Sequence, residues 1–255
     1  MLKTIKEWLE HPLTRGMALD DPRTTARRLE VIRSKHFLSN IYAEWYRAIS
    51  SYFAPEAGVL EIGSGAGFLK EFLPGLITSE IFEVPGVDRM IDAQSIDFDD
   101  ASLDGIAMTD VFHHLPDCGR FFTEATRVIR PGGRIVMIEP WNTGWGRLIY
   151  QNLHHEPFQP HVADWKFPAG GPLSAANGAL PWIVLERDRV EFTRRFPGLS
   201  IERIAPLMPI SYLISGGVSM RSLVPGWSYQ IVRTLERISG EHRTGMFALI
   251  VIRRK

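Results

Sequence analysis

The sequence "VLEIGSGAGFL", Val59 to Leu69, carries the strongest structural signal in the chain. Its first four residues are apolar except for Glu61, and glycines then stand at alternate positions, Gly63, Gly65 and Gly67. A short apolar run of this kind is typical of a strand buried on both faces of a parallel sheet. Glycines after such a strand indicate a turn whose backbone comes close to other atoms, because side chains are absent there. The stretch therefore predicts a strand that ends in a glycine turn.

Predicted strands and helices alternate along the rest of the chain. Helices are expected at residues 22–53 (two helices), 67–73, 117–129, 187–198 and 226–238, and strands at residues 59–62, 76–82, 89–94, 103–111, 134–140, 199–209 and 245–254. No helix fits between the strands at 76–82 and 89–94, since the linking segment "EVPGVD" is only a short turn. Asp117 is expected to cap the helix that follows it. This alternation predicts a doubly wound, mostly parallel α/β sheet.

Composition limits the class of protein. The 255-residue chain is 45% hydrophobic, enough to bury the core of one large domain. Lys and Arg (29) balance Asp and Glu (29), so no overall charge attracts nucleic acid or an anionic membrane. The single cysteine, Cys118, cannot form an intramolecular disulfide, and residues 1–12 lack the apolar stretch of an export signal. The longest apolar run, residues 246–252, is too short to span a bilayer. These features predict a cytoplasmic protein without a nucleic-acid partner.

The glycine pattern separates two kinds of nucleotide fold. A dinucleotide fingerprint needs G-x-G-x-x-G, and Phe68 occupies the position of its last glycine. The pattern E-x-G-x-G-x-G, which starts at Glu61, instead resembles motif I of the class I S-adenosylmethionine-dependent methyltransferases. Further matches extend to Pro140 and resemble the type 11 branch of that family. The resemblance implies a Rossmann-like, seven-stranded sheet with an antiparallel final strand, and S-adenosylmethionine as cofactor.

The resemblance also implies where the adenosine part of the cofactor binds. An acid at the end of the second strand accepts hydrogen bonds from the ribose, and Glu80 matches it. An acid and a small residue after the third strand hold the adenine, and Asp92 and Ala93 match them. In a rival register Asp88 takes the ribose and Asp97 the adenine. We prefer the first register because residues 102–104 then begin the fourth strand.

The segment "TDVFHHLPD" resembles the part of the family that touches the methionine end of the cofactor. Across all motifs, the resemblance assigns cofactor binding to Glu61, Gly63, Ser64, Gly65, Gly67, Glu80, Asp92, Ala93, Thr109 and Asp110. His113 and His114 follow directly, and an imidazole can take a proton from an acceptor at neutral pH. We expect one of them to act as a general base; alternatively, one packs under the helix and the other holds the loop by hydrogen bonds.

Residues 141–181 lack a regular period and are interpreted as an insertion over the rim of the sheet. His154, His155, Glu156 and His161 could indicate a metal site in it. Adjacent histidines usually point apart, however, and no cysteine or H-x-x-x-H pair supports such a site. We therefore predict no metal and expect the loop to shape the acceptor pocket.

Aromatic residues lie in two groups outside the cofactor motifs. Tyr42, Trp45 and Tyr46 share one face of a predicted helix, which either packs on the sheet or closes as a lid over the cofactor. The second group consists of tryptophans in the segments that vary with substrate in this family: Trp141, Trp145, Trp165, Trp182 and Trp227. Core packing is the default interpretation of these rings, and exposed ones would favour an apolar acceptor.

The sequence thus predicts one methyltransferase domain over residues 1–255. It comprises a helical cap (1–55), a cofactor-binding half (56–140), a substrate-side insertion (141–190) and the remaining sheet (191–255). The predicted reaction is in-line methyl transfer to a small or amphiphilic acceptor, including lipid-linked or cell-surface precursors, with transient contact at a membrane surface. The alternatives are an NAD(P)-dependent oxidoreductase and a non-catalytic protein that binds S-adenosylmethionine. The sequence does not predict an oligomeric state.

Overall fold

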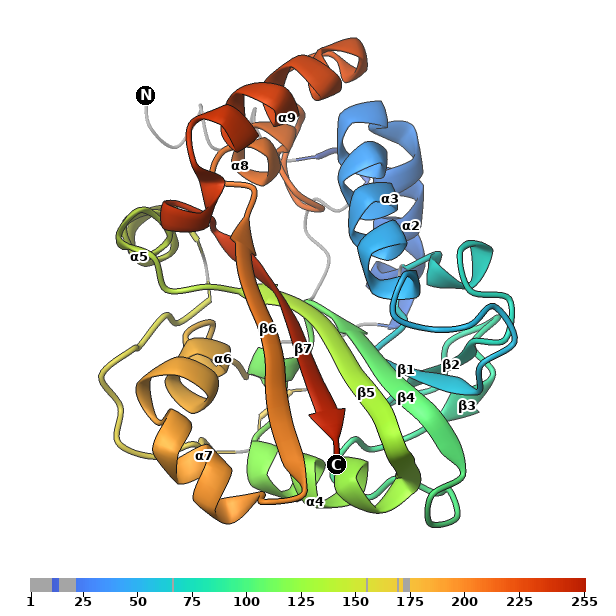
Figure 1. Ribbon diagram of the computed structural model, residues 1–255. Coiled ribbons are helices and arrows are strands. Elements are labelled where there is room, and N and C mark those ends of the chain that lie inside the picture. Colours follow the sequence, from blue (N-terminus) through green and yellow to red (C-terminus); the bar gives the residue numbers. More distant parts are fainter. Residues whose placement is uncertain (1–10, 14–21, 66, 155, 169, 172–174) are drawn as a thin grey trace.

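The computed structural model describes residues 11–13, 22–65, 67–154, 156–168, 170–171 and 175–255, arranged around a seven-stranded sheet (Figure 1). The strands lie in the order β3-β2-β1-β4-β5-β7-β6. Their bounds are β1 Val59–Ile62, β2 Ile77–Glu80, β3 Arg89–Met90, β4 Leu103–Thr109, β5 Ile129–Pro140, β6 Leu199–Leu207 and β7 Phe247–Arg254. Strands β1 to β5 pair in parallel, and β7 is antiparallel to both of its neighbours. The predicted fold class and the antiparallel final strand are confirmed.

The central strands are apolar because both faces of the sheet are covered. All four residues of β1 are buried, including Glu61, and so are the first six residues of β7. Strand β7 pairs with β5 from Arg253, opposite Arg134, to Phe247, opposite Pro140. In the parallel pairs Ile62 lies opposite Met108 and Thr109 opposite Ile138, so the carboxyl ends of β1, β4 and β5 lie together at one end of the sheet.

The helices are α2 Pro22–Ser34, α3 His36–Ser50, α4 Cys118–Val128, α5 Gly144–Leu153, α6 Leu180–Trp182, α7 Arg189–Arg195, α8 Ser211–Ser215 and α9 Tyr229–Ile238. Helices α2 and α3 confirm the predicted pair. The predicted cap of α4 is confirmed as well, because the Asp117 carboxylate accepts hydrogen bonds from the backbone N–H groups of Gly119 (3.1 Å) and Arg120 (3.2 Å). Among the described residues, no helix has both the length and the apolar character needed to cross a membrane.

Three predicted elements differ from the structure. The helix predicted over 67–73 is wrong: the segment forms only a 3-10 turn at Leu69–Glu71, since Pro74 and Gly75 leave too little chain for a regular helix. The strand predicted over 89–94 shortens to Arg89–Met90. The "RPGG" segment lies inside β5 and does not precede it, because Ile129 is already extended. No helix lies between β2 and β3, as predicted.

Helix α3 packs against the sheet near the carboxyl ends of the parallel strands. Trp45 is 1% exposed, and its ring centroid lies 4.9 Å from that of Phe247 on β7. On α4, Phe122 contacts Phe112, which follows β4, and Phe192 of α7. In Figure 1, α3, α8 and α9 lie near the upper end of the sheet, where the parallel strands end. These helices therefore border the edge at which ligands bind in open α/β sheets.

Candidate functional site

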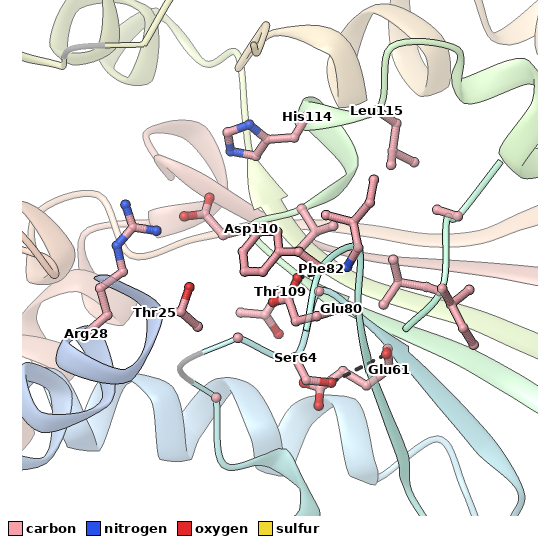
Figure 2. A pocket seen from close by; sticks show the side chains of 18 of the residues that line it. Thr25, Arg28, Glu61, Ser64, Glu80, Phe82, Thr109, Asp110, His114 and Leu115 are labelled. Carbon is pink, nitrogen blue, oxygen red and sulfur yellow. Dashed lines mark hydrogen bonds between the residues drawn. The ribbon is translucent and has the colours of Figure 1, made fainter. Parts of the chain in front are cut away.

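A cavity of about 430 Å³ opens beyond the carboxyl ends of the parallel strands (Figure 2). Its wall is formed by the segments that follow β1, β2 and β4, by the turn after β3, and by side chains of α2 and α3. Residues 170, 171, 175 and 218 complete the rim from the insertion and from the segment after α8. Ligand cavities in proteins have volumes of about 300–1,000 Å³, so this cavity can hold a small molecule.

The glycine turn is shaped by contacts with the protein itself. Gly63 has a φ of +66°, and a Cβ atom there would lie 2.6 Å from Cγ2 of Val111. Gly65 has a φ of +40°, and a Cβ atom there would lie 3.0 Å from Oε1 of Glu80. Both conformations are strained for residues with side chains. At Gly67 the space is taken by the Ser64 carbonyl oxygen, 2.7 Å from the position of a Cβ atom. The turn therefore lies close under the cavity, with its backbone exposed to it.

Ser64 fastens this turn to β2. Its backbone N–H donates to the carbonyl oxygen of Ser79 (2.9 Å), and its hydroxyl accepts from the Ser79 N–H (3.0 Å). Glu61 lies in the cavity wall and is 3% exposed. Its burial raises the pKa of the carboxyl group to about 7. Ionisation of the buried Glu61 carboxyl group therefore costs free energy unless a cation lies beside it.

The two candidate ribose acids lie in different surroundings. Glu80 is in the cavity wall, and burial raises the pKa of its carboxyl group. Asp88 is not in the wall; it accepts hydrogen bonds from the Thr78 N–H (2.9 Å), the Thr78 hydroxyl (2.8 Å) and the Lys70 ammonium (2.7 Å). These bonds hold the pKa of Asp88 at about 2. Asp88 therefore stabilises the turn between β2 and β3, and the geometry favours Glu80 for the ribose.

The predicted adenine residues also line the cavity. Asp92 and Ala93 follow β3, and the Asp92 carboxylate accepts from the Gln94 N–H (2.8 Å), which closes a tight turn. Asp97, the residue of the rival register, is not part of the wall. Ile81 and Phe82 add apolar surface to the cavity wall. This end of the cavity combines apolar walls with one carboxylate, as binding of a flat heterocycle requires.

Thr109 and Asp110 end β4 inside the cavity. The Thr109 hydroxyl oxygen is buried and has no hydrogen-bond partner among the described residues. Asp110 has a φ of +62°, which is strained for a residue other than glycine. Burial raises the pKa of its carboxyl group to about 7. In Figure 2, the carboxyl of Asp110, the guanidinium of Arg28 and the imidazole of His114 gather at one side of the cavity. Arg28 of α2 was missed by the sequence analysis.

A buried carboxylate that the sequence analysis missed holds the loop after β4. Glu139 is fully buried near the end of β5 and accepts hydrogen bonds from the N–H groups of Val111 and Phe112, each at 2.8 Å. Its second oxygen lies 2.8 Å from Nδ1 of His113. The signal in the sequence was an acid at the end of an otherwise apolar strand, directly before Pro140.

The structure separates the two predicted catalytic histidines. His113 is fully buried and lies outside the cavity wall. Burial alone would lower its pKa, but the carboxylates of Glu139 and Glu156 raise it well above the usual range. The prediction that His113 can act as the base is therefore wrong, since His113 is fully buried and does not reach the cavity.

His114 remains the candidate base because it lines the cavity. Its Nδ1 lies 3.1 Å from the carbonyl oxygen of Ala175. A carbonyl oxygen only accepts, so Nδ1 carries the hydrogen and Nε2 carries the lone pair. Burial and the neighbouring charge of His113 lower the pKa of His114 to about 4, and its imidazole is neutral at pH 7.

The insertion brings one of the residues that were considered, and rejected, as metal ligands to this loop. Glu156 lies beside His113 and His114, whereas His161 is exposed and His154 is 3.8 Å from Glu156 (Nδ1 to Oε2). His155 lies outside the described residues. A second, small cavity of about 20 Å³ reaches from Asp110 to Glu156 and is walled by Tyr150, Phe158, Tyr212 and Phe247. The insertion therefore shapes the space beyond Asp110.

The aromatic groups are mostly buried. Trp45 packs in the core, while Tyr42 and Tyr46 also line the cavity, so packing and a cofactor contact are compatible. Trp141 and Trp165 are buried. Trp227 is 77% exposed, directly before α9.

The strand order, the glycine turn after β1 and the acid at the end of β2 are those of a Rossmann-like methyltransferase fold, and comparisons with known proteins point to the same fold. Residues 60–137 match the family model described as "Methyltransferase domain", of the type 11 group. The chain is 33% identical over 79 residues to 2-methyl-6-phytyl-1,4-hydroquinone methyltransferase of Synechocystis sp.; the match covers 31% of this chain and 24% of that protein. The chain thus spans about a quarter of the length of this relative.

A solved structure resembles nearly the whole chain. It is geranyl diphosphate C-methyltransferase from Streptomyces coelicolor A3(2), which was crystallised with Mg²⁺, geranyl diphosphate and S-adenosyl-L-homocysteine. The TM-score is 0.51 at 16% identity, and the alignment covers 97% of this chain and 92% of that one. This likeness concerns the fold. Residues 60–137 are thus similar to the methyltransferase domain of the type 11 group, and the chain has the fold of an S-adenosylmethionine-dependent methyltransferase.

Proposed function

We propose that this protein transfers the methyl group of S-adenosylmethionine to a small or amphiphilic acceptor by in-line displacement. The observation that carries the proposal is the single cavity that joins the glycine turn and Glu80 at one side to Asp110 and His114 at the other. A cofactor bound along the strand ends would place its methyl group toward Asp110 and His114. The space beyond them is then the place of the acceptor.

In this proposal the cofactor-binding residues act as the resemblance implies. The Glu80 carboxylate accepts hydrogen bonds from the ribose, and Asp92 and Ala93 flank the adenine. The acidic side chain of Glu61 faces the cationic methionine end, which offsets the cost of its burial. The hydroxyl of Thr109, which has no partner among the described residues, supplies a further polar contact.

Catalysis by this site depends mainly on positioning. An acceptor lone pair attacks the methyl carbon while the carbon–sulfur bond breaks and its electron pair passes to sulfur. Orienting two reactants near contact lowers a barrier by up to about 7–11 kcal/mol. The lone pair on Nε2 of His114 can take a proton from an acceptor, although a pKa of about 4 makes it a weak base.

We infer an amphiphilic acceptor from an exposed apolar surface on and before α9. Trp227, Ile231, Leu235 and Ile238, which we call the α9 stripe, recur at helical spacing and are 77%, 55%, 61% and 79% exposed. Val218, in the segment that leads to α9, lines the cavity itself. The relative in Synechocystis is named for a phytyl-substituted hydroquinone, an acceptor of similar character. Lipid-linked and cell-surface precursors are included in this class.

Calorimetric titration tests the proposal directly. The protein is titrated separately with S-adenosylmethionine, S-adenosylhomocysteine and NAD. Binding of the first two, with none of NAD, is expected. NAD binding without a response to the others would favour the oxidoreductase alternative. Methyl transfer from labelled cofactor into fractionated cell extract then separates an enzyme from a non-catalytic binding protein, and the labelled fraction identifies the acceptor class.

The division into one domain over residues 1–255 is part of the same proposal, with residues 141–190 on the acceptor side. The described residues of this insertion reach Asp117, where Lys166 forms an ion pair at 2.7 Å, and the cavity, which Gly170 and Ala175 line. The cytoplasmic location stays a prediction from the sequence.

A further inference from the structure

Three groups that commonly bind metals converge beside the cavity. His113 and His114 end the 3-10 turn Phe112–His114, and Glu156 approaches them from the insertion. Nε2 of His113 is 3.3 Å from Oε2 of Glu156, and Nε2 of His114 is 3.9 Å from Oε1. Their ligand atoms all lie within 4.8 Å of one another. The tight turn brings the rings of His113 and His114 to one side, with centroids 4.2 Å apart.

Both imidazoles are oriented by bonds on their far nitrogens. Nδ1 of His113 lies 2.8 Å from the carboxylate of Glu139, and Nδ1 of His114 lies 3.1 Å from the carbonyl oxygen of Ala175. Glu139 is itself held by two backbone N–H groups. Metal-binding histidines almost always donate their second N–H to a carboxylate or a carbonyl in this way, which fixes the ring and the tautomer. Both Nε2 atoms are thereby turned toward Glu156.

An ion pair between His113 and Glu156 explains this arrangement less well than a metal site. Nε2 of His113 is fully buried and lies 3.3 Å from Oε2 of Glu156, but this contact lacks the geometry of a hydrogen bond. Zn²⁺ binds imidazole nitrogen and carboxylate oxygen at about 2.0–2.2 Å, so two ligands of one ion lie about 3.0–3.5 Å apart. The separation of 3.3 Å fits this range, and the separation of 3.9 Å needs a shift of only a few tenths of an ångström.

We propose that His113, His114 and Glu156 bind a divalent transition-metal ion, with open coordination positions toward the acceptor. Two nitrogen ligands and one oxygen ligand suit Zn²⁺ or Fe²⁺ better than Mg²⁺ or Ca²⁺, which prefer oxygen. Three protein ligands with an open position are typical of catalytic sites and not of structural ones. This proposal revises the sequence prediction of no metal. Of the insertion residues that the sequence analysis considered as ligands, only Glu156 belongs to the proposed site.

The role of the ion rests on the proposed methyl transfer. The site adjoins both Asp110 and His114, where the acceptor is expected. With Nε2 of His114 bound to the ion, His114 is no longer the base. The ion would instead make a hydroxyl or enol oxygen of the acceptor more acidic, and the proton would pass to water. The electron pair of the deprotonated acceptor then attacks the methyl carbon, and the electron pair of the carbon–sulfur bond passes to sulfur. The proposal therefore names acceptors with an acidic oxygen.

Metal binding is tested on the full chain without a histidine tag, after chelation and buffer exchange. Titration with Zn²⁺ is followed by calorimetry, and Co²⁺ serves as a spectroscopic probe of the ligands. One ion per chain is expected, together with a Co²⁺ absorption spectrum typical of nitrogen and oxygen ligation and a higher unfolding temperature with Zn²⁺. Glu156→Gln and His114→Gln should each weaken Zn²⁺ binding by at least about tenfold.

The matched control is His161→Gln, which removes an exposed histidine from the same insertion. This variant should bind Zn²⁺ as the wild type does. The metal site is excluded if the wild type binds no Zn²⁺, or if Glu156→Gln and His114→Gln both bind as tightly as the wild type. Two variants guard against a folding defect in one of them. S-adenosylmethionine titrated into the same samples separates the two proposals, since loss of the metal site alone leaves cofactor binding intact.

Discussion

Two carboxylates only a few residues apart along the chain have opposite roles in this structure. Glu80 faces the cavity, whereas three hydrogen-bond donors occupy Asp88. Glu80→Gln should therefore weaken S-adenosylmethionine binding by about tenfold or more, since a hydrogen bond to a charged group contributes about 1.5–3 kcal/mol. Isothermal calorimetry measures this change. Asp88→Asn is the control and should keep the affinity within about twofold; the reverse result would move the ribose to Asp88.

A second residue-scale effect depends on pH. Burial raises the pKa of Glu61 from 4.5 to about 7, so its protonated form is favoured in the folded state. This raised pKa stabilises the folded state fully below pH 4.5. The stabilisation is lost as the pH rises from 4.5 to about 7. Relative to Glu61→Gln, the wild type should lose up to about 3 kcal/mol of unfolding free energy between pH 4.5 and pH 7.5.

Denaturant unfolding of both proteins at several pH values measures this difference. S-adenosylmethionine should reduce the pH dependence, because its cationic end compensates the ionised Glu61. Parallel stability curves of wild type and variant across this range would show that Glu61 ionises without cost, and the argument for its role would fail.

Sequence reasoning at the residue scale worked where a residue acts through its backbone segment. Gly63, Gly65 and Glu80 line the cavity as expected, because their positions at strand ends are local properties of the sequence; their roles stay predictions. Glu139 and Arg28 were missed, since their partners lie far away along the chain and only the tertiary fold brings them together. The directions of His113 and His114 also depend on a tight turn whose geometry the sequence does not specify.

At the scale of elements, Asp117 both caps α4 and anchors the insertion. Its carboxylate accepts from two backbone N–H groups and pairs with Lys166 at 2.7 Å. Asp117→Ala should destabilise the protein by about 1 kcal/mol or more, while Asp117→Asn keeps the cap and should cost less than half as much. Chemical denaturation compares the three proteins. Equal losses in both variants would mean that the charge, and not the cap, is the stabilising feature.

The elements themselves were predicted well where their hydrophobic period was long. Strands β1, β4 and β7 and helices α3 and α4 lie close to their expected bounds. The errors fall on short segments: residues 67–73 cannot complete a helix before Pro74, and β3 keeps only two residues at the edge of the sheet. Helix α5 in the insertion was missed because it begins with Gly-Trp-Gly and lies in a segment without a clear hydrophobic period.

At the scale of the whole molecule, α9 has an inverted distribution of polarity. Its inner face buries Arg233, which pairs with Glu44 (2.7 Å), Glu241 (2.8 Å) and Glu236. Its outer face exposes the α9 stripe. Exposed Arg237 and Arg243 lie on and next to the helix. An apolar stripe with a terminal tryptophan and neighbouring basic residues is typical of helices that bind a lipid surface.

We therefore expect the protein to bind vesicles that contain anionic lipid. Replacing Ile231 and Leu235 together by serine should lower the partition coefficient of the protein onto the vesicles by at least about tenfold. Each side chain contributes about 1.5–3 kcal/mol when it is fully buried in an apolar phase. Sedimentation with vesicles measures the partition. Val190→Ser is the matched control, since Val190 is 85% exposed on α7, away from the stripe, and its loss should not change binding. If the wild type does not sediment with vesicles but elutes as a dimer that the double variant dissociates, the stripe is a subunit interface and the acceptor must reach the cavity from solution.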